Sequence, residues 1–162
     1  MEDVVKSLGY LALGTRLKRL GERLQAQTQV VLEQAELDLP AGHVPVLAAL
    51  DRLEGLNVGE LTEALGVSQP GVTRMLDKLQ TEGLVRSAQS EDDRRVRTIE
   101  LTRPGQQLVA KARRTTWREI EAAVADACAG SAVTLLPALA ALEEALAQMP
   151  LSARIGRKHA ST

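Results

Sequence analysis

The segment 57–66 constrains the fold most strongly, because its start and stop signals define one short helix. Asn57 and Glu60 have the spacing of a capping box, in which each side chain bonds the backbone amide of the other residue. The helix extends to about Leu65, and Gly66 supplies the left-handed residue with which helices commonly end.

A second helix follows after one turn and covers residues 68–82. Ser68 can cap its start, and Pro70 fits the first turn, where backbone amides lack helical partners. Gly83 marks its end. One face carries the apolar spacing of a buried stripe, namely Val72, Met75, Leu76 and Leu79. The two helices and their turn predict a helix-turn-helix.

Two β-prone runs come next, at residues 84–87 and 96–101, and a polar loop joins them. In the second run, alternation places Ile99 and Leu101 on one face and Thr98 on the other. A two-stranded hairpin is marginally stable by itself, so we expect it to pack against the helix-turn-helix. This combination is a winged helix-turn-helix.

Helical patterns flank this lobe on both sides. An amphipathic pattern covers residues 3–37, and a second helix is predicted at 41–53 after Pro40. After the hairpin, Thr102 begins a helix that extends to about residue 129. The last predicted helix covers residues 132–148, where Pro137 requires either a kink or a later start. The fold class is therefore mainly α with a small β-hairpin (α+β).

The composition argues against an enzyme, a cofactor or a metal site. Cys128 is the only cysteine, which excludes an internal disulfide framework and a cysteine-based metal cluster. His43 and His159 lie far apart in the sequence and have no ligand spacing. No paired acids or nucleophile–base spacing are present, so Cys128 could meet a histidine only through the tertiary fold. We therefore expect no catalytic residue, no metal and no cofactor.

The chain ends and apolar runs favour the cytoplasm. No run approaches the roughly 18 apolar residues of a membrane span. The first ten residues, MEDVVKSLGY, lack the basic and then apolar regions of a secretory signal. The net charge of −1 gives no global attraction to nucleic acid, so a DNA-binding surface would have to be local.

The polar face of the helix at 68–82 has residue types suited to the major groove of duplex DNA. Arg74 can bond guanine in a bidentate manner, Gln69 can pair with adenine, and Thr73 can contact a base or a thymine methyl group. Ser68 and nearby amides can hold a phosphate, and Lys78 suits the DNA backbone. A solvated face on an ordinary helical protein is the alternative.

The loop of the predicted hairpin carries three acids and then two arginines, in the order Ser90-Glu91-Asp92-Asp93-Arg94-Arg95. A wing tip commonly inserts arginine into a narrow minor groove, where the negative potential is enhanced. An Asp two residues before the arginine can hold its guanidinium by a charge-assisted bond. The other interpretation is a solubilising turn.

Residues 57–105 resemble the MarR (multiple antibiotic resistance regulator) family of winged-helix transcription factors. The resemblance rests on the runs Leu65-Gly66-Val67-Ser68, Val72-Thr73-Arg74-Met75-Leu76-Asp77-Lys78-Leu79, Glu82-Gly83-Leu84-Val85-Arg86, Asp93-Arg94-Arg95 and Leu101-Thr102-Arg103-Pro104-Gly105. The order of these pieces, with five residues between the Asp-x-Arg and the Leu-Thr, is specific. One departure is Gln80, where the family usually carries an acid.

The resemblance implies a homodimer on double-stranded DNA. The first and last helices would interlock, which makes residues 1–38 and 104–150 a dimerisation region and 39–103 the DNA-binding lobe. Residues 151–162 form a mobile basic tail in this interpretation. Each recognition helix would enter a major groove of a pseudo-palindromic operator. Each wing would place Arg95 in the minor groove with support from Asp93, and Arg94 lies beside them.

Many members of the family are repressors that small aromatic acids or phenolic compounds release, and others sense oxidants through an N-terminal cysteine. This chain has no cysteine in its first helix, so we do not expect thiol sensing. Five residues are candidates for an effector pocket: Tyr10, Arg16, His43, Arg86 and Trp117. Arg16 and Arg86 could pair with a carboxylate. Dimer packing and surface contacts are the alternative roles.

The sequence therefore predicts a sequence-specific transcription regulator, with a ligand-responsive repressor as the commoner form. The alternative is a winged-helix protein-interaction module without specific DNA binding, which the low net charge favours. The operator, the regulated genes, the effector and the choice between repression and activation are not specified by the residues.

Overall fold

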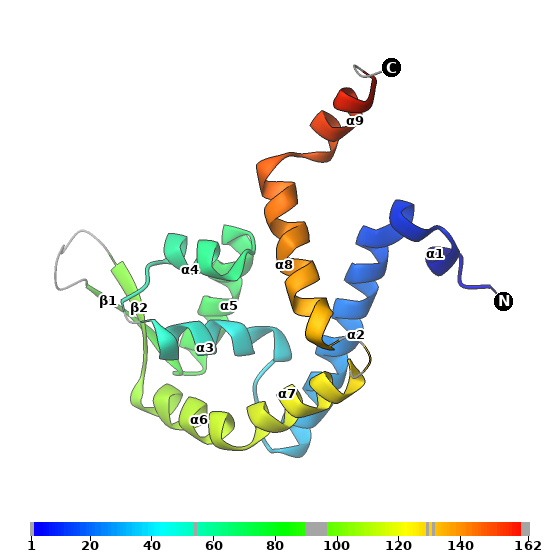
Figure 1. The fold of residues 1–162 in the computed structure, drawn as a ribbon. Coiled ribbons are helices and arrows are strands. Elements are labelled where there is room, and N and C mark those ends of the chain that lie inside the picture. The colour runs from blue at the N-terminus through cyan, green and yellow to red at the C-terminus, as the bar shows by residue number, and fades with distance from the viewer. Residues whose placement is uncertain (1, 54, 90–96, 129, 131, 160–162) are drawn as a thin grey trace. The chain divides into compact units, whose positions relative to one another are not determined.

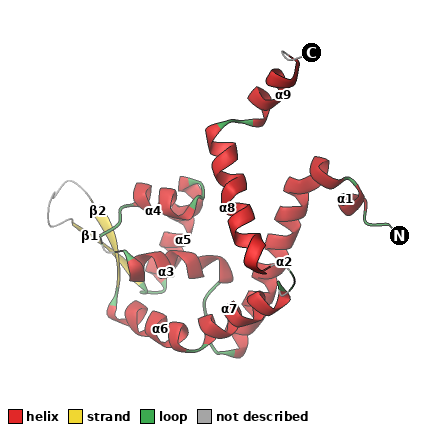
Figure 2. Cartoon of the chain, in the orientation of Figure 1, coloured by secondary structure: helices red, strands yellow, loops and turns green. Residues whose placement is uncertain are grey.

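The computed structural model describes residues 2–53, 55–89, 97–128, 130 and 132–159. The chain divides into two compact units, residues 1–120 and 121–162, and each is considered by itself. The described residues form helices and one two-stranded sheet (Figure 2), as the sequence predicts. None of the helices in this part of the chain is both long and apolar enough to cross a membrane.

The N-terminal segment is broken where the sequence predicts one continuous helix. It forms α1 (Val4–Ser7), the 3-10 helix η1 (Gly9–Ala12) and α2 (Leu13–Gln34). Gly9 has a φ of +55°, a left-handed conformation that interrupts helical geometry. Arg19 of α2 donates two hydrogen bonds to the carboxylate of Asp3, at 3.1 and 3.0 Å, which holds the start of α1 against α2.

The helix predicted at 41–53 begins as a 3-10 turn, η2 (Ala41–His43), and continues as α3 (Val44–Arg52). Pro40 lies at the N-cap of η2 with extended backbone, in agreement with the predicted break. The buried apolar residues of α3 are Val46, Leu47 and Leu50.

The helix-turn-helix consists of α4 (Val58–Leu65) and α5 (Gln69–Thr81). The capping box is confirmed: Glu60 N donates to Asn57 Oδ1 at 3.0 Å, and Asn57 N donates to Glu60 Oε2 at 2.8 Å. Gly66 ends α4 in the left-handed conformation, with a φ of +62°. Ser68 occupies the N-cap of α5, but its side chain makes no capping hydrogen bond there, contrary to the prediction.

The hairpin pairs β1 (Val85–Gln89) with β2 (Arg97–Leu101) in antiparallel register, with Val85 opposite Leu101. It lies at one end of the lobe formed by α3, α4, α5 and α6 (Figure 1). Ile99 N donates to Leu56 O at 2.8 Å, so β2 lies between β1 and the backbone that precedes α4. Thr98 is buried, whereas alternation predicts that it faces away from the core.

The main core of the first unit joins α3, α4, α5, the hairpin and α6 (Arg103–Arg114). It is built from aliphatic side chains, which the absence of Phe requires. The predicted stripe of α5 is confirmed: three of its four residues are buried, and Met75 packs against them partly buried. The buried members are Leu39, Val46, Leu47, Leu50, Leu61, Val72, Leu76, Leu79, Leu84, Val85, Ile99, Leu101 and Val109.

The helix predicted to run from Thr102 to about residue 129 is two helices, α6 and α7 (Thr116–Ala127). Thr102 caps α6 as predicted, because its Oγ1 accepts from Gly105 N at 3.2 Å. The break falls at Thr115, whose backbone is non-helical and whose hydroxyl donates to Lys111 O at 3.2 Å.

The second unit contains α8 (Ala132–Gln148), with Pro137 inside it and the bounds that the sequence predicts. It also contains α9 (Leu151–His159), where the sequence predicts a tail without secondary structure. The guanidinium of Arg154 donates to Met149 O at 3.0 Å and also to Ala145 O. Arg154 thereby satisfies carbonyl groups at the C-terminal end of α8.

Candidate nucleic-acid interface

One face of helix α5 packs against the core, and the opposite face is exposed to solvent. Val72 and Leu79 are fully buried and Leu76 nearly so, which anchors the helix on the core. Its opposite face is exposed to solvent and carries Gln69, Thr73, Arg74, Asp77 and Lys78. At a rise of about 1.5 Å per residue, its 13 residues extend about 20 Å. A helix of this size fits the major groove of B-form DNA.

The N-terminal end of α5 has backbone amides that the Ser68 hydroxyl does not cap. Ser68 is exposed, and its Oγ lies 3.3 Å from the position that a Cβ on Gly71 would take. The first intrahelical amide bond is from Val72 N to Ser68 O, at 3.0 Å. An uncapped helix start with a nearby hydroxyl is suited to a phosphate oxygen.

The polar side chains of α5 differ in how far they are free to bind another molecule. The Thr73 hydroxyl donates to Gln69 O at 3.0 Å, so it retains acceptor capacity and a methyl group for an external contact. Lys78 forms an ion pair of 3.4 Å with Glu82, which draws its ammonium group toward the C-terminal end of α5. Arg74 has no ion pair or side-chain hydrogen bond with any residue that the structure describes.

The wing residues Asp93, Arg94 and Arg95 lie outside the described residues. The described base of the hairpin fixes where this loop leaves the lobe, since Gln89 and Arg97 are its last paired residues. Arg86 and Glu100 are opposite each other in the register, and Arg86 Nη2 donates to Glu100 Oε2 at 2.9 Å. A cross-strand pair of opposite charges favours this register.

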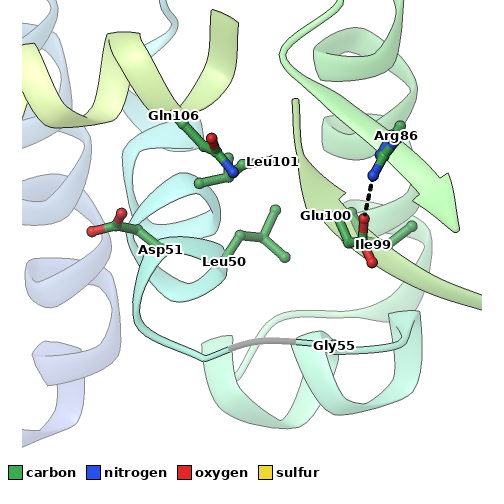
Figure 3. A pocket seen from close by; sticks show the side chains of 8 residues that line it. All are labelled: Leu50, Asp51, Gly55, Arg86, Ile99, Glu100, Leu101 and Gln106. Atoms are coloured by element: carbon green, nitrogen blue, oxygen red, sulfur yellow. Dashed lines mark hydrogen bonds and ion pairs between the residues drawn. The ribbon is translucent and has the colours of Figure 1, made fainter. Parts of the chain in front are cut away.

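The five residues predicted for an effector pocket lie in different environments. Tyr10 is 94% exposed, and Arg16 is also exposed. His43 is buried, and Trp117 is half-buried and packs against both core clusters. Arg86 lines a cavity of about 370 Å³ between α3, the hairpin and α6 (Figure 3), but none of the other four does. Their assignment to one pocket stays a prediction.

Two buried polar atoms have no hydrogen-bond partner among the described residues, namely His43 Nδ1 and Trp117 Nε1. Burial lowers the pKa of His43 below the usual 6.5, because the charged imidazolium is poorly solvated there. Glu82 opposes this effect and Lys78 adds to it, so the imidazole lies within electrostatic reach of the last turn of α5. Nothing in the sequence pattern indicates either unpaired atom.

The lowered pKa of His43 predicts a loss of stability in acid. Below pH 6.5 the unfolded chain binds a proton at this position more readily than the folded chain does. The free energy of unfolding should therefore be highest above pH 6.5 and should fall as the pH decreases from 7.5 to 5.5. Urea unfolding at both pH values should show a smaller fall for His43→Gln than for the parent. His159→Gln is the control, and an equal fall in all three proteins would contradict the prediction.

Comparison with known proteins places this arrangement among regulators of transcription. Residues 37–96 match the model of the MarR family. YfiV of Bacillus subtilis (strain 168), an uncharacterized HTH-type transcriptional regulator, is 35% identical over 72 residues. That match spans 44% of this chain and 45% of YfiV, so it covers less than half of either protein.

Two solved structures are similar over most of the chain. The transcriptional repressor CouR, bound to a 23-mer DNA duplex, is 29% identical, with a TM-score of 0.69 over 84% of this chain and 96% of CouR. The M. tuberculosis transcriptional regulator MosR, in complex with DNA, is 26% identical, with a TM-score of 0.70 over 85% of this chain and 97% of MosR.

Proposed function

Because this chain belongs to the MarR family of winged helix-turn-helix regulators, we propose that it is a sequence-specific DNA-binding transcription regulator. The observation that carries the proposal is the two-sided character of α5. Its apolar face is locked into the core, while Gln69, Thr73 and Arg74 are exposed at its N-terminal half. The similar proteins CouR and MosR have each been solved with DNA, which supports the same role here.

The contacts follow from the chemistry of each side chain. Arg74 bonds guanine, Gln69 pairs with adenine, and Thr73 uses its methyl group or its free acceptor capacity on a base. Ser68 and the uncapped amides of α5 hold a phosphate, and Lys78 contacts the backbone. In the wing, Arg95 enters the minor groove with support from the acid two residues earlier, Asp93, and Arg94 adds a backbone contact.

A second copy of the chain completes the regulator. The N-terminal segment exposes large apolar side chains, and the most exposed of them are Tyr10 at 94% and Leu11 at 86%. Large exposed apolar patches commonly mark an interaction surface. Residues 1–38 and 104–150 act as the dimerisation region and 39–103 as the DNA-binding lobe. Two lobes then read a pseudo-palindromic operator whose half-sites lie one helical turn apart.

In more detail, we propose that the protein is a cytoplasmic repressor without catalytic activity. A small aromatic acid or phenolic compound would release it from DNA. The effector would lie near Tyr10, Arg16, His43, Arg86 and Trp117, with the dimer bringing together groups that one chain keeps apart. Within the described part of the chain, His43 Nδ1 and Trp117 Nε1 have no hydrogen-bond partner, which favours a role in binding polar groups of a ligand or of the partner chain.

Salt dependence of binding to a selected operator tests the proposal. Fragments of the source genome are selected with the full chain, and the affinity for the best fragment is measured at 50 and 200 mM salt. Neutralisation of six to ten phosphates predicts a fall on the order of a thousandfold or more. A scrambled duplex should bind far more weakly at both salt concentrations. Equal binding of the two duplexes would instead favour the alternative function, a winged-helix protein-interaction module without specific DNA binding. The net charge of −1 also favours that alternative.

A further inference from the structure

The exposed face of α5 carries an acid, Asp77, to which the proposed DNA contacts give no role. The apolar stripe of α5 faces the core, and the middle of the exposed face lies opposite it. At about 100° per residue, Arg74 and Asp77 each lie about 30° from that middle, on opposite sides of it. The two residues are about 4.5 Å apart along the helix axis. Asp77 is therefore directed outward beside Arg74.

The carboxylate of Asp77 is not neutralised by its own helix. Arg74, three residues earlier, has the spacing of a helical ion pair with Asp77, but the two side chains form none. Lys78 pairs instead with Glu82, at 3.4 Å. The Thr81 hydroxyl donates to the backbone oxygen of Asp77, at 2.8 Å, and not to its carboxylate. Within the described part of the chain, both carboxylate oxygens of Asp77 are therefore free to accept hydrogen bonds from another molecule.

An unpaired carboxylate in the middle of this face limits what duplex DNA can offer it. Phosphate oxygens and the carboxylate are both acceptors of like charge, so Asp77 gains no bond from the DNA backbone and is repelled by it. The major groove presents two amino donors, N4 of cytosine and N6 of adenine. Adenine also presents the acceptor N7 beside its amino group, which a carboxylate cannot bond. Cytosine presents the amino group alone, and it is the base that suits Asp77.

We infer that Asp77 determines part of the sequence specificity of α5, because its carboxylate accepts a hydrogen bond from N4 of a cytosine. The separation of about 4.5 Å between Arg74 and Asp77 along the axis corresponds to about one base-pair step of 3.4 Å. The cytosine therefore belongs to the base pair next to the one whose guanine Arg74 binds. This role rests on the proposed DNA-binding function and adds to it a second specified base pair in each half-site.

Base preference along the selected operator tests this role. The affinity of the full chain for the operator, and for duplexes with each base pair replaced in turn, is measured by fluorescence anisotropy. In the parent, replacement of the cytosine next to the guanine that Arg74 binds should raise the Kd at least fivefold. Asp77→Asn should lose this preference and favour adenine at the same position, since an amide accepts from N6 and donates to N7 of adenine. A purely structural role would not transfer the preference from one base to another.

Two further variants separate base reading from a general effect of charge. Asp77→Ala should lose the preference for cytosine without gaining one for adenine. It should also bind a scrambled duplex at least twofold more tightly than the parent does, because a charge that repels phosphate is removed. Glu63→Gln removes the same charge from the exposed surface of α4 and is the matched control, which should keep every base preference.

Two results would overturn this role of Asp77 alone. One is a set of parental base preferences that Asp77→Asn retains unchanged, even if it binds all duplexes more tightly. The other is a loss confined to the guanine preference in Asp77→Ala, which would make Asp77 a positioning residue for Arg74. A parent without any base preference would overturn the proposed function as well, so the two failures are distinguishable.

Discussion

Replacement of Gly105 by alanine is expected to lower the free energy of unfolding by about 3 kcal/mol. A Cβ at this position would lie 2.0 Å from the carbonyl oxygen of Leu84 and 3.0 Å from its carbonyl carbon. The contact is with backbone, so no side-chain rotation relieves it. The same carbonyl oxygen accepts from Thr102 N at 3.0 Å, so its displacement would break this backbone hydrogen bond.

Chemical denaturation of the parent and of Gly105→Ala measures this difference. Gly14→Ala is the matched control, because Gly14 lies in a helix and an added Cβ there meets nothing within 4 Å. That control should match the parent or exceed its stability by up to about 1 kcal/mol, since alanine favours helix more than glycine does. A Gly105→Ala protein within about 0.5 kcal/mol of the parent would mean that α6 can move away from the hairpin at no cost.

The second large effect is on DNA. Arg74→Ala should weaken binding to the selected operator by about 1–3 kcal/mol, or roughly tenfold to a hundredfold, because one bidentate contact with guanine is lost. The fold should be unaffected, since Arg74 is exposed and has no ion pair with the residues that the structure describes. Arg114→Ala removes the same charge from the exposed surface of α6 and serves as the control. Equal losses for the two variants, measured by fluorescence anisotropy, would rule out a specific contact of Arg74.

The elements with local boundary signals could be predicted from the sequence. The start and end of α4 follow from the capping box at Asn57 and from Gly66, which act within a few residues of the backbone. Two other breaks were missed because the helical pattern continues across them. One depends on the left-handed backbone of Gly9, and the other falls at Thr115, whose backbone leaves the helical conformation.

Residues of the candidate site could be predicted from the sequence only where they all lie on a single helix. The exposed face of α5 follows from helical periodicity, so Arg74 and Thr73 could be named from the sequence alone. That His43 Nδ1 lacks a partner among the residues that the structure describes could not be predicted, because it depends on which elements bury the imidazole. The cavity next to Asp51 and Arg86 likewise depends on the packing of α3 and α6 against the hairpin. The sequence shows a glycine at position 105, but it does not show why a glycine is required there. The requirement comes from the close approach of α6 to the backbone of Leu84.

The base preference of the Arg74→Ala and Lys78→Ala variants, position by position along the selected operator, tests most directly whether α5 reads DNA sequence. The account predicts that Arg74→Ala loses its preference at one base pair in each half-site and keeps it elsewhere. Lys78→Ala should bind every sequence more weakly by a similar factor and show a shallower salt dependence. Unchanged base preferences in Arg74→Ala, with full affinity for the operator, would contradict the account.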